Sequence, residues 1–362
     1  MPSILLLADI NSSHTRKWAE ELVANGYRIG IFSISKPLLN WYSPYGIEVL
    51  RTSESFDTGH SFFSKLKYVS LLSELKTACK KFDPDLMHAH YATSYGLLAA
   101  LSGFKPYLIS VWGSDVFDFP KRSFLHKQIL KYNLKRSDCV ISSSKIMAEE
   151  VRKYFSGQIE VIPFGIDLSV FKRNSHHNEK LTIGIIKSME DYYGIDDLIR
   201  AFKIVIESRA DSPLKLLLIG GGTQIEKYKK LVSDLGLISH VEFRGKIAQE
   251  LVPAAHNEID IFVNPSVHES FGVSVLEASA TENPVIVTNV GGLNEVVVNN
   301  STGFIVQQGN VNELVKAISY FVDNKEQIDI FGKKGRLFVS DNYDLKKVST
   351  KITDLYSSFL KR

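Results

Sequence analysis

Short, almost wholly apolar runs alternate along this chain with longer segments in which apolar residues recur every three or four positions. The short runs predict buried strands, and the longer segments predict helices that pack on them. Strands that are apolar throughout are typical of parallel sheets with both faces covered, so the alternation indicates an α/β, doubly wound architecture. In the first half, the expected strands are Ile4–Ala8, Arg28–Ser33, Leu86–His90, Tyr107–Val111, Cys139–Ser142 and Glu160–Ile162. In the second half, they are Leu181–Ile186, Leu214–Ile219, Val241–Arg244, Ile259–Val263, Pro284–Val287 and Gly303–Val306.

The length of the chain and a break near its middle predict two domains. At 362 residues, the chain exceeds the size that a single hydrophobic core usually serves. Pro163 and Gly165 interrupt the pattern, and the polar stretch Lys172–Glu179 follows them, which marks a boundary. The expected divisions are a first domain at 1–166, a second at 167–344 and a final helix at 345–362.

One unit of strand, loop and helix carries two carboxylates. Ile259–Val263 is the strand, Glu269 falls on the loop, and Glu277 falls in a helix of small residues. Amides at the start of such a helix favour an anion such as a phosphate. Leu276 and Ala278 flank Glu277, which favours an inward position. The alternative is that Glu269 is a charge favoured by the helix dipole and Glu277 a solvated residue.

The spacing of these glutamates argues against a glycosidase. Eight residues of helix span ~12 Å, whereas the carboxyl pair of a glycosidase lies roughly 5 to 9.5 Å apart. We therefore expect Glu269 and Glu277 to hold different parts of one extended ligand.

The segment Val267–Ala280 resembles the signature of the retaining glycosyltransferases of family 4 (group 1), and Glu269 and Glu277 match both of its ends. The resemblance extends over nearly the whole chain. It implies the GT-B fold, in which two Rossmann-like domains face a central cleft, the first binding the acceptor and the second a nucleotide sugar. The final helix would pack back on the first domain. Glu269 would orient the donor sugar, and Glu277 would hold the ribose hydroxyls. The amides expected to hold phosphate are those of Ser270, Phe271 and Gly272.

Further residues of the second domain match the donor side of that family. Lys187 follows the first strand of this domain and would neutralise the leaving diphosphate. Relatives carry a second cation nearby, but Tyr192 and Tyr193 occupy its expected place. By resemblance, Gly245 and Lys246 lie beside the base.

Three turns of the first domain follow predicted strands, where doubly wound sheets place ligands. His90 stands at the exit of one strand. Trp112 stands where relatives have a histidine that contacts the donor sugar, and it either stacks on a ligand or packs internally. The acceptor-binding set implied by the resemblance is Ser12, His14, His90 and Trp112, and Ser13 would bind the donor. The implied catalytic set is Glu269, Lys187, His90 and Asp115.

Composition narrows the class of protein. Hydrophobic content of 44% and charged content of 23% are those of a globular chain, and two cysteines without ligand spacing favour a reducing cytoplasmic location. Neither a signal peptide nor an apolar run long enough for a membrane span is expected. Asp83 and Asp85 precede a strand, at the wrong end for a metal site. We therefore expect no metal and no cofactor besides a nucleoside-diphosphate sugar as donor substrate.

The positive charge is concentrated in the first half. Residues 1–166 hold 20 Lys and Arg against 15 Asp and Glu, although the whole chain carries only +3. The acid-free stretch Phe119–Ser137 contains a lysine stripe at Lys127, Lys131 and Lys135 beside apolar residues. Such a helix predicts weak peripheral contact with the anionic inner face of a membrane. The alternative is an ordinary surface helix, and weak overall basicity argues against nucleic acid.

The resemblance implies a glycosyltransferase that moves a sugar from a nucleoside-diphosphate sugar to a glycan, lipid-linked or small-molecule hydroxyl with retention, in cell-surface polysaccharide or glycoconjugate synthesis. The alternative is a catalytically silent GT-B protein that binds a sugar nucleotide. An oxidoreductase is disfavoured because Ile225 stands where the dinucleotide fingerprint begun by Gly220–Gly222 needs a further glycine.

Overall fold

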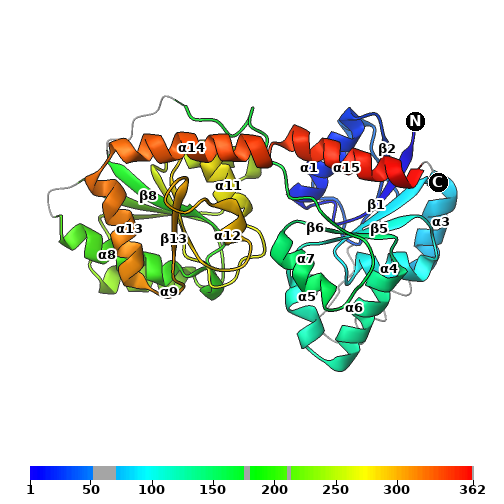
Figure 1. Ribbon diagram of the computed structural model, residues 1–362, viewed down its shortest axis with the longest axis horizontal. Helices are drawn as coiled ribbons and strands as arrows, with labels where there is room; N and C mark the ends of the chain where they lie inside the picture. Colours follow the sequence, from blue (N-terminus) through cyan, green and yellow to red (C-terminus); the bar gives the residue numbers. More distant parts are fainter. Residues whose placement is uncertain (52–70, 175–179, 210–212, 361–362) are drawn as a thin grey trace. The chain divides into compact units, whose positions relative to one another are not determined.

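The computed structural model divides the chain into two compact units (Figure 1). It describes residues 1–51, 71–174, 180–209 and 213–360. Unit 1 comprises Met1–Phe164 with Val348–Arg362, and unit 2 comprises Gly165–Lys347. The junctions therefore fall within three residues of the divisions expected at 166 and 345.

Unit 1 is built on a parallel sheet in the order β3-β2-β1-β4-β5-β6-β7. Its strands are β1 Ser3–Leu7, β2 Arg28–Phe32, β3 Glu48–Val49, β4 Leu86–His90, β5 Tyr107–Val111, β6 Cys139–Ser142 and β7 Ile159–Val161. The sequence pattern missed β3, because two residues are too short to show a period.

Helices cover both faces of this sheet. They are α1 Ser13–Ala24, α3 Leu72–Phe82, α4 Tyr95–Ser102, α5 Ser114–Phe117, α6 Phe124–Arg136, α7 Lys145–Arg152 and α15 Leu345–Leu360. Successive strand residues point to opposite faces. Leu5 and Leu7 of β1 accordingly join one core cluster, whereas Ile4 and Leu6 join another.

The last helix supplies a large part of the second cluster. Along α15, the buried apolar residues recur at helical spacing and pack with Ile4, Leu6 and residues of α1. They are Val348, Ile352, Leu355, Tyr356 and Phe359. A segment more than 250 residues away in sequence therefore completes the core around β4.

Unit 2 repeats the architecture with a parallel sheet in the order β10-β9-β8-β11-β12-β13. Its strands are β8 Leu181–Ile186, β9 Leu214–Ile219, β10 Val241–Gly245, β11 Ile261–Asn264, β12 Val285–Thr288 and β13 Gly303–Val306. Its helices are α8 Ile195–Glu207, α9 Ile225–Asp234, α10 Val252–Asn257, α11 Val273–Ala280, α12 Leu293–Val296, α13 Val311–Asp323 and α14 Glu326–Asn342. All the strands expected from the sequence are present, and the predicted pair of doubly wound parallel sheets is confirmed.

Candidate functional site

In unit 2, the loops that follow the strands gather chemically distinct groups at one edge of the sheet. Lys187 comes directly after β8, and Glu269 lies on the loop between β11 and α11. The carboxyl ends of parallel strands meet at the same edge, which is where such sheets bind ligands. Residues far apart in sequence thereby reach a common location.

Lys187 and Glu269 form an ion pair at this edge. The Lys187 Nζ lies 2.5 Å from the Glu269 Oε2, and their side chains are 15% and 11% exposed. The same ammonium lies 4.5 Å from the ring centroid of Tyr193. A cation and a carboxylate that are both partly shielded from water therefore stand side by side.

Two glycines let other loops approach this pair closely. Gly291 has a φ of +49°, and a Cβ there would lie 1.8 Å from the carbonyl oxygen of Glu269. Gly220 has a φ of +144°, and a Cβ there would lie 1.8 Å from the carbonyl oxygen of Lys187. Sequence reasoning missed Gly291, although a Gly-Gly pair shortly after an apolar strand was a usable signal.

The segment before α11 turns sharply into the helix. The helix begins at Val273 after the cap residue Gly272, whose φ is +107°. The Phe271 side chain is buried and packs near the Tyr343 ring, with centroids 5.8 Å apart. Ser270 and Gly272 complete the turn between Glu269 and the helix.

Glu277 points into unit 2. It is 6% exposed, and its Oε2 lies 3.6 Å from the Nε2 of the fully buried His256 on α10. The alternative of a solvated helix residue is therefore wrong. No spacing signal along the chain indicated His256 as its neighbour, because only the packing of α10 beside α11 brings them together.

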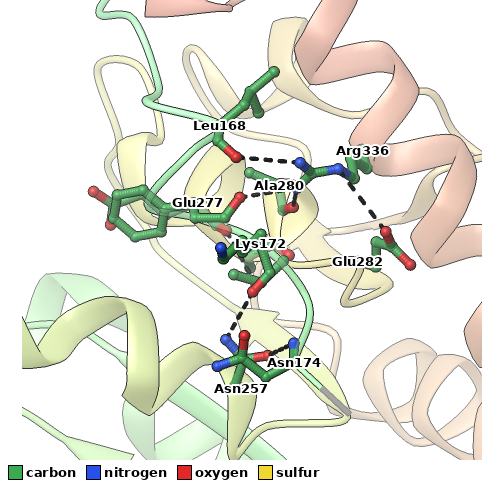
Figure 2. A network of polar contacts seen from close by, with 11 residues as sticks. Leu168, Lys172, Asn174, Asn257, Glu277, Ala280, Glu282 and Arg336 are labelled. Atoms are coloured by element: carbon green, nitrogen blue, oxygen red, sulfur yellow. Dashed lines mark hydrogen bonds and ion pairs between the residues drawn. The ribbon is translucent and has the colours of Figure 1, made fainter.

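A polar network fixes the frame around Glu277 (Figure 2). The Arg336 guanidinium on α14 donates to the carbonyl oxygens of Leu168, Phe171 and Ala280. Asn257 donates to the carbonyl oxygen of Lys172, the residue after Phe171. The chain that enters unit 2 is thus fastened to the end of α11.

The turns after β9 and β10 are joined as well. The Gly220 amide donates to the carbonyl oxygen of Gly245 over 2.9 Å, and Gly245 has a φ of +73°. Lys246 is exposed next to this turn. Gly245 and Lys246 therefore lie at the same edge as Lys187.

In unit 1, His88 belongs to the core. Its Nδ1 lies 2.5 Å from the Tyr356 hydroxyl of α15, and its Nε2 lies 2.8 Å from the Ser110 hydroxyl. Burial, followed by the nearby His90, lowers the pKa of His88 well below its usual value. His88 is therefore a neutral, hydrogen-bonded core residue.

His90 is also buried, but its hydrogen bonding differs from that of His88. It is 1% exposed, and neither ring nitrogen has a hydrogen-bond partner within the described part of the chain. Its ring centroid lies 5.1 Å from that of Trp112 and 5.5 Å from that of Trp18. Burial lowers the pKa of His90 to about 3, and the charge of His14 adds to that effect. The imidazole is thus neutral and has hydrogen-bonding capacity at the strand exit.

Aromatic rings extend the surroundings of His90. His14 stacks on Phe164 with centroids 4.2 Å apart, and Trp112 lies 5.7 Å from His14 and 5.8 Å from Phe164. Sequence reasoning missed Phe164, which it had counted only as part of the domain boundary. Ser12 and Ser13 lie at the start of α1, directly before His14.

Asp115 holds the turn that carries Trp112. Its fully buried carboxylate accepts hydrogen bonds from the amides of Ala92, Trp112 and Gly113. Burial raises the pKa of Asp115, although these amides act in the opposite direction. Both oxygens are engaged with the backbone, so Asp115 holds the turn that carries Trp112. Its expected catalytic role stays a prediction.

Neither a metal cluster nor a membrane-spanning helix is found among the described residues. Within the described residues, no group of three or more His, Cys, Asp or Glu side chains is placed to hold a metal ion. Asp85 instead accepts hydrogen bonds from Ser3 at the amino end of β4. Among the described helices, none is both long enough and apolar enough to cross a bilayer. Metal independence therefore stays a prediction.

Two family models match the sequence: Glycosyl transferases group 1 over residues 169–338 and Glycosyl transferase 4-like over residues 3–144. An uncharacterized glycosyltransferase of Methanocaldococcus jannaschii is 30% identical over 257 residues, covering 70% of this chain and 70% of that protein. A GDP-mannose-dependent alpha-(1-6)-phosphatidylinositol monomannoside mannosyltransferase of Mycobacterium tuberculosis is 28% identical over 216 residues, covering 55% of this chain and 56% of that protein. Anabaena HepE, solved with UDP and glucose, has a TM-score of 0.82 at 17% identity, covering 99% of this chain and 100% of that one.

The fold shared with HepE is that of the GT-B class, which confirms the expected fold. The chain belongs to the group 1 glycosyltransferases, as the resemblance of its motifs indicated. It is therefore a glycosyltransferase.

Proposed function

We propose that this enzyme transfers a sugar from a nucleoside-diphosphate donor to a hydroxyl of a glycan, lipid-linked or small-molecule acceptor, with retention at the anomeric carbon. The observation that carries the proposal is the Lys187–Glu269 pair at the carboxyl edge of the unit 2 sheet. A cation there suits a diphosphate, and a carboxylate beside it suits the hydroxyls of the attached sugar. Synthesis of a cell-surface polysaccharide or glycoconjugate is the proposed setting.

Each group of unit 2 has a distinct role in this proposal. Lys187 neutralises the charge that develops on the leaving diphosphate. The amides of the Ser270–Gly272 turn assist it at the start of α11. Glu269 orients the donor sugar, and Glu277 binds the ribose hydroxyls from inside the helix. Gly245 and Lys246 lie beside the base, and Ser13 of unit 1 contacts the donor through its backbone.

Unit 1 supplies the acceptor side. Ser12, His14, His90 and Trp112 bind the acceptor, and His90 offers a neutral imidazole to a hydroxyl. The leaving diphosphate takes the proton of the attacking hydroxyl on the same face of the sugar. That step accounts for retention without a covalent glycosyl intermediate.

The relatives support the kind of donor. The mycobacterial relative is described as dependent on GDP-mannose, and HepE was solved with UDP and glucose. Both descriptions include a nucleoside diphosphate, as GDP in one and as UDP in the other. They support a nucleotide-sugar donor here and leave its base and sugar to experiment.

The proposal includes weak contact of α6 with the inner face of an anionic membrane. Phe124 is 78% exposed, and Leu125 and Tyr132 are 44% and 43% exposed on the same helix. Lys127 and Lys135 are exposed beside them. Exposed apolar side chains among lysines suit the boundary between headgroups and acyl chains. This location would bring a cytoplasmic enzyme to lipid-linked acceptors.

A panel of nucleotide sugars tests the donor assignment. A donor at 100 times its dissociation constant stabilises the folded protein by about 2.7 kcal/mol, which raises the midpoint of thermal unfolding. The donor that stabilises the protein is then incubated with candidate acceptors, and nucleotide release is measured. The anomeric configuration of the product is read by NMR.

Three results would separate the alternatives. Nucleotide release with a retained anomeric configuration supports the proposal. Stabilisation without turnover across the acceptor panel supports the silent sugar-nucleotide-binding protein. An inverted product contradicts retention while leaving the donor assignment intact.

A further inference from the structure

Two unlike side chains hold the ammonium of Lys187. The Glu269 carboxylate lies 2.5 Å from the Nζ, and the Tyr193 ring centroid lies 4.5 Å from the same atom. A cation within about 6 Å of an aromatic centroid is attracted by the ring face. The ammonium is thus fixed by one charged and one uncharged partner.

The turn that carries Tyr193 is hydrogen-bonded to the loop that carries Glu269. Tyr193 ends the single turn Asp191–Tyr193, and its amide donates to the Glu190 carbonyl oxygen. The Tyr192 carbonyl oxygen accepts a 2.9 Å hydrogen bond from the amide of Val267, two residues before Glu269. A backbone hydrogen bond therefore joins the turn that carries the ring to the loop that carries the carboxylate.

The Tyr193 side chain beside Lys187 is a neutral phenol. Burial raises the pKa of Tyr193, and the charge of Glu269 raises it further. The phenol therefore stays protonated throughout the physiological range. Its ring face attracts a cation without carrying a formal charge that would repel an incoming phosphate.

We propose that Tyr193 is the positioning residue of Lys187, and that its ring keeps the ammonium in place when a diphosphate displaces Glu269. This inference rests on the proposed function, in which Lys187 binds the diphosphate and Glu269 turns to the sugar. A phosphate and Glu269 compete for the same ammonium because both are anions. The ring does not compete, so it remains the fixed partner of Lys187 before and after donor binding.

Nucleotide titrations of the full-length chain test the inference. UDP, UMP, GDP and GMP are titrated calorimetrically into the wild type and into Tyr193→Leu, Tyr193→Phe and Tyr192→Leu. We expect Tyr193→Leu to weaken binding of the diphosphate roughly 2- to 30-fold, the range of a cation–π contact. The ratio of diphosphate to monophosphate affinity should fall as well. This ratio separates a local effect from a general loss of folding, which would weaken the binding of both nucleotides alike.

The two other variants isolate the ring face. Tyr193→Phe keeps a ring and loses only the hydroxyl, so it should bind within about twofold of the wild type. Tyr192→Leu is the control on the neighbouring ring: it removes the 48% exposed ring that lies 4.5 Å from the Tyr193 ring and keeps the ring over Lys187, so it should lower the affinity ratio less than Tyr193→Leu does. If Tyr193→Leu lowers the midpoint of thermal unfolding, Tyr193→Met repeats the comparison with a longer side chain.

Several results would overturn the inference. Wild-type affinity in Tyr193→Leu would show that the ring does not position Lys187. Equal losses in Tyr193→Leu and Tyr192→Leu would assign the effect to the loop, and equal losses in Tyr193→Leu and Tyr193→Phe would assign it to the hydroxyl. If the wild type binds neither UDP nor GDP, ADP and dTDP are titrated as well, and failure of all four contradicts the proposed function itself, which is distinct from a failure confined to the Tyr193 variants.

Discussion

The carboxyl edges of the two sheets carry opposite kinds of chemistry. In unit 2, the groups at this edge are charged, with Lys187 and Glu269 paired at 2.5 Å. In unit 1, aromatic rings and a neutral imidazole lie at this edge, and the buried Asp115 carboxylate is engaged with backbone amides. His90 has a pKa lowered to about 3, and its ring packs near that of Trp112. The same fold thus presents a polar edge for a charged ligand in one unit and an apolar, hydrogen-bonding edge in the other.

This difference shows how a repeated fold acquires two binding preferences. Parallel sheets with covering helices fix where the loops lie, and the loop residues fix what they bind. A charged edge suits a diphosphate because fixed opposite charge stabilises it. A neutral edge suits sugar hydroxyls because they need hydrogen bonds and ring contacts without the desolvation of an ion.

The largest effect is expected when the Lys187 charge is removed from the charged edge of unit 2. We expect Lys187→Ala to lower kcat roughly 10²- to 10³-fold, the usual loss for one group that stabilises developing negative charge. His90→Ala should instead raise KM for the acceptor and leave nucleoside-diphosphate affinity unchanged. Steady-state kinetics with both substrates varied, together with nucleotide titrations, measure both effects. Loss of diphosphate affinity in His90→Ala would contradict the division of roles.

Glu277 tests whether the buried part of unit 2 also binds the nucleotide. Glu277→Ala removes hydrogen bonds from a charged group, which corresponds to about 10- to 100-fold in nucleotide affinity. Calorimetric titration measures the change, and circular dichroism verifies the fold. Glu326→Ala on α14 is the control, because that glutamate is exposed at the start of its helix. Unchanged affinity in Glu277→Ala would show that its pairing with His256 is purely structural.

Acid should weaken unit 1 through its buried histidines. His88 and His90 have folded pKa values below the usual 6.5, so the unfolded chain takes up protons first as pH falls. For His90, the contribution is complete above pH 6.5 and is lost as pH falls toward 3. His90 should raise the unfolding equilibrium constant about tenfold per pH unit within that window, and His88 acts in the same direction.

Tryptophan fluorescence measures this effect in unit 1 alone, because Trp18, Trp41 and Trp112 all lie there. Denaturant unfolding is followed at several values between pH 7 and pH 4. His90→Gln should reduce the slope of the free energy of unfolding against pH by the contribution of one proton. The same slope in this variant as in the wild type would remove His90 from the account.

For the basic helix α6, we expect each lysine to make a smaller contribution, here to the binding of anionic vesicles. Each lysine near an anionic surface contributes about 1 kcal/mol, or roughly fivefold in partition. Replacement of Lys127, Lys131 and Lys135 by Glu should reduce sedimentation with anionic vesicles, and 0.5 M salt should weaken binding of the wild type. The control with the same charge change is Lys76, Lys80 and Lys81 to Glu on α3. Equal losses in both variants would indicate nonspecific attraction.

Chelation is expected to have no effect on turnover. Lys187 and the amides before α11 stabilise the diphosphate in the proposed mechanism, so no divalent ion is required. Activity is assayed with EDTA and then with added Mg²⁺ or Mn²⁺. Complete loss with the chelator and recovery with a divalent ion would show that Lys187 does not act alone.

The sequence by itself determined the strands, the order of the units and the positions of the main chemical groups. These follow from local patterns: a buried strand reads as an apolar run, and a helix as a period of three to four. Lys187 stands just after such a strand, His90 ends one, and Glu269 lies on the loop between a strand and a helix. The burial of Glu277 was also indicated by its small and apolar neighbours.

Only the tertiary structure decided which groups meet. Lys187 and Glu269 are 82 residues apart, and the Tyr356 hydroxyl that binds His88 is 268 residues from it. No period along the chain encodes such pairs, because they arise when separate strands and helices pack together. The same reason applies to Asp115, for which the resemblance implied a catalytic role. Its burial among three backbone amides, which no spacing reveals, shows that it also holds the Trp112 turn.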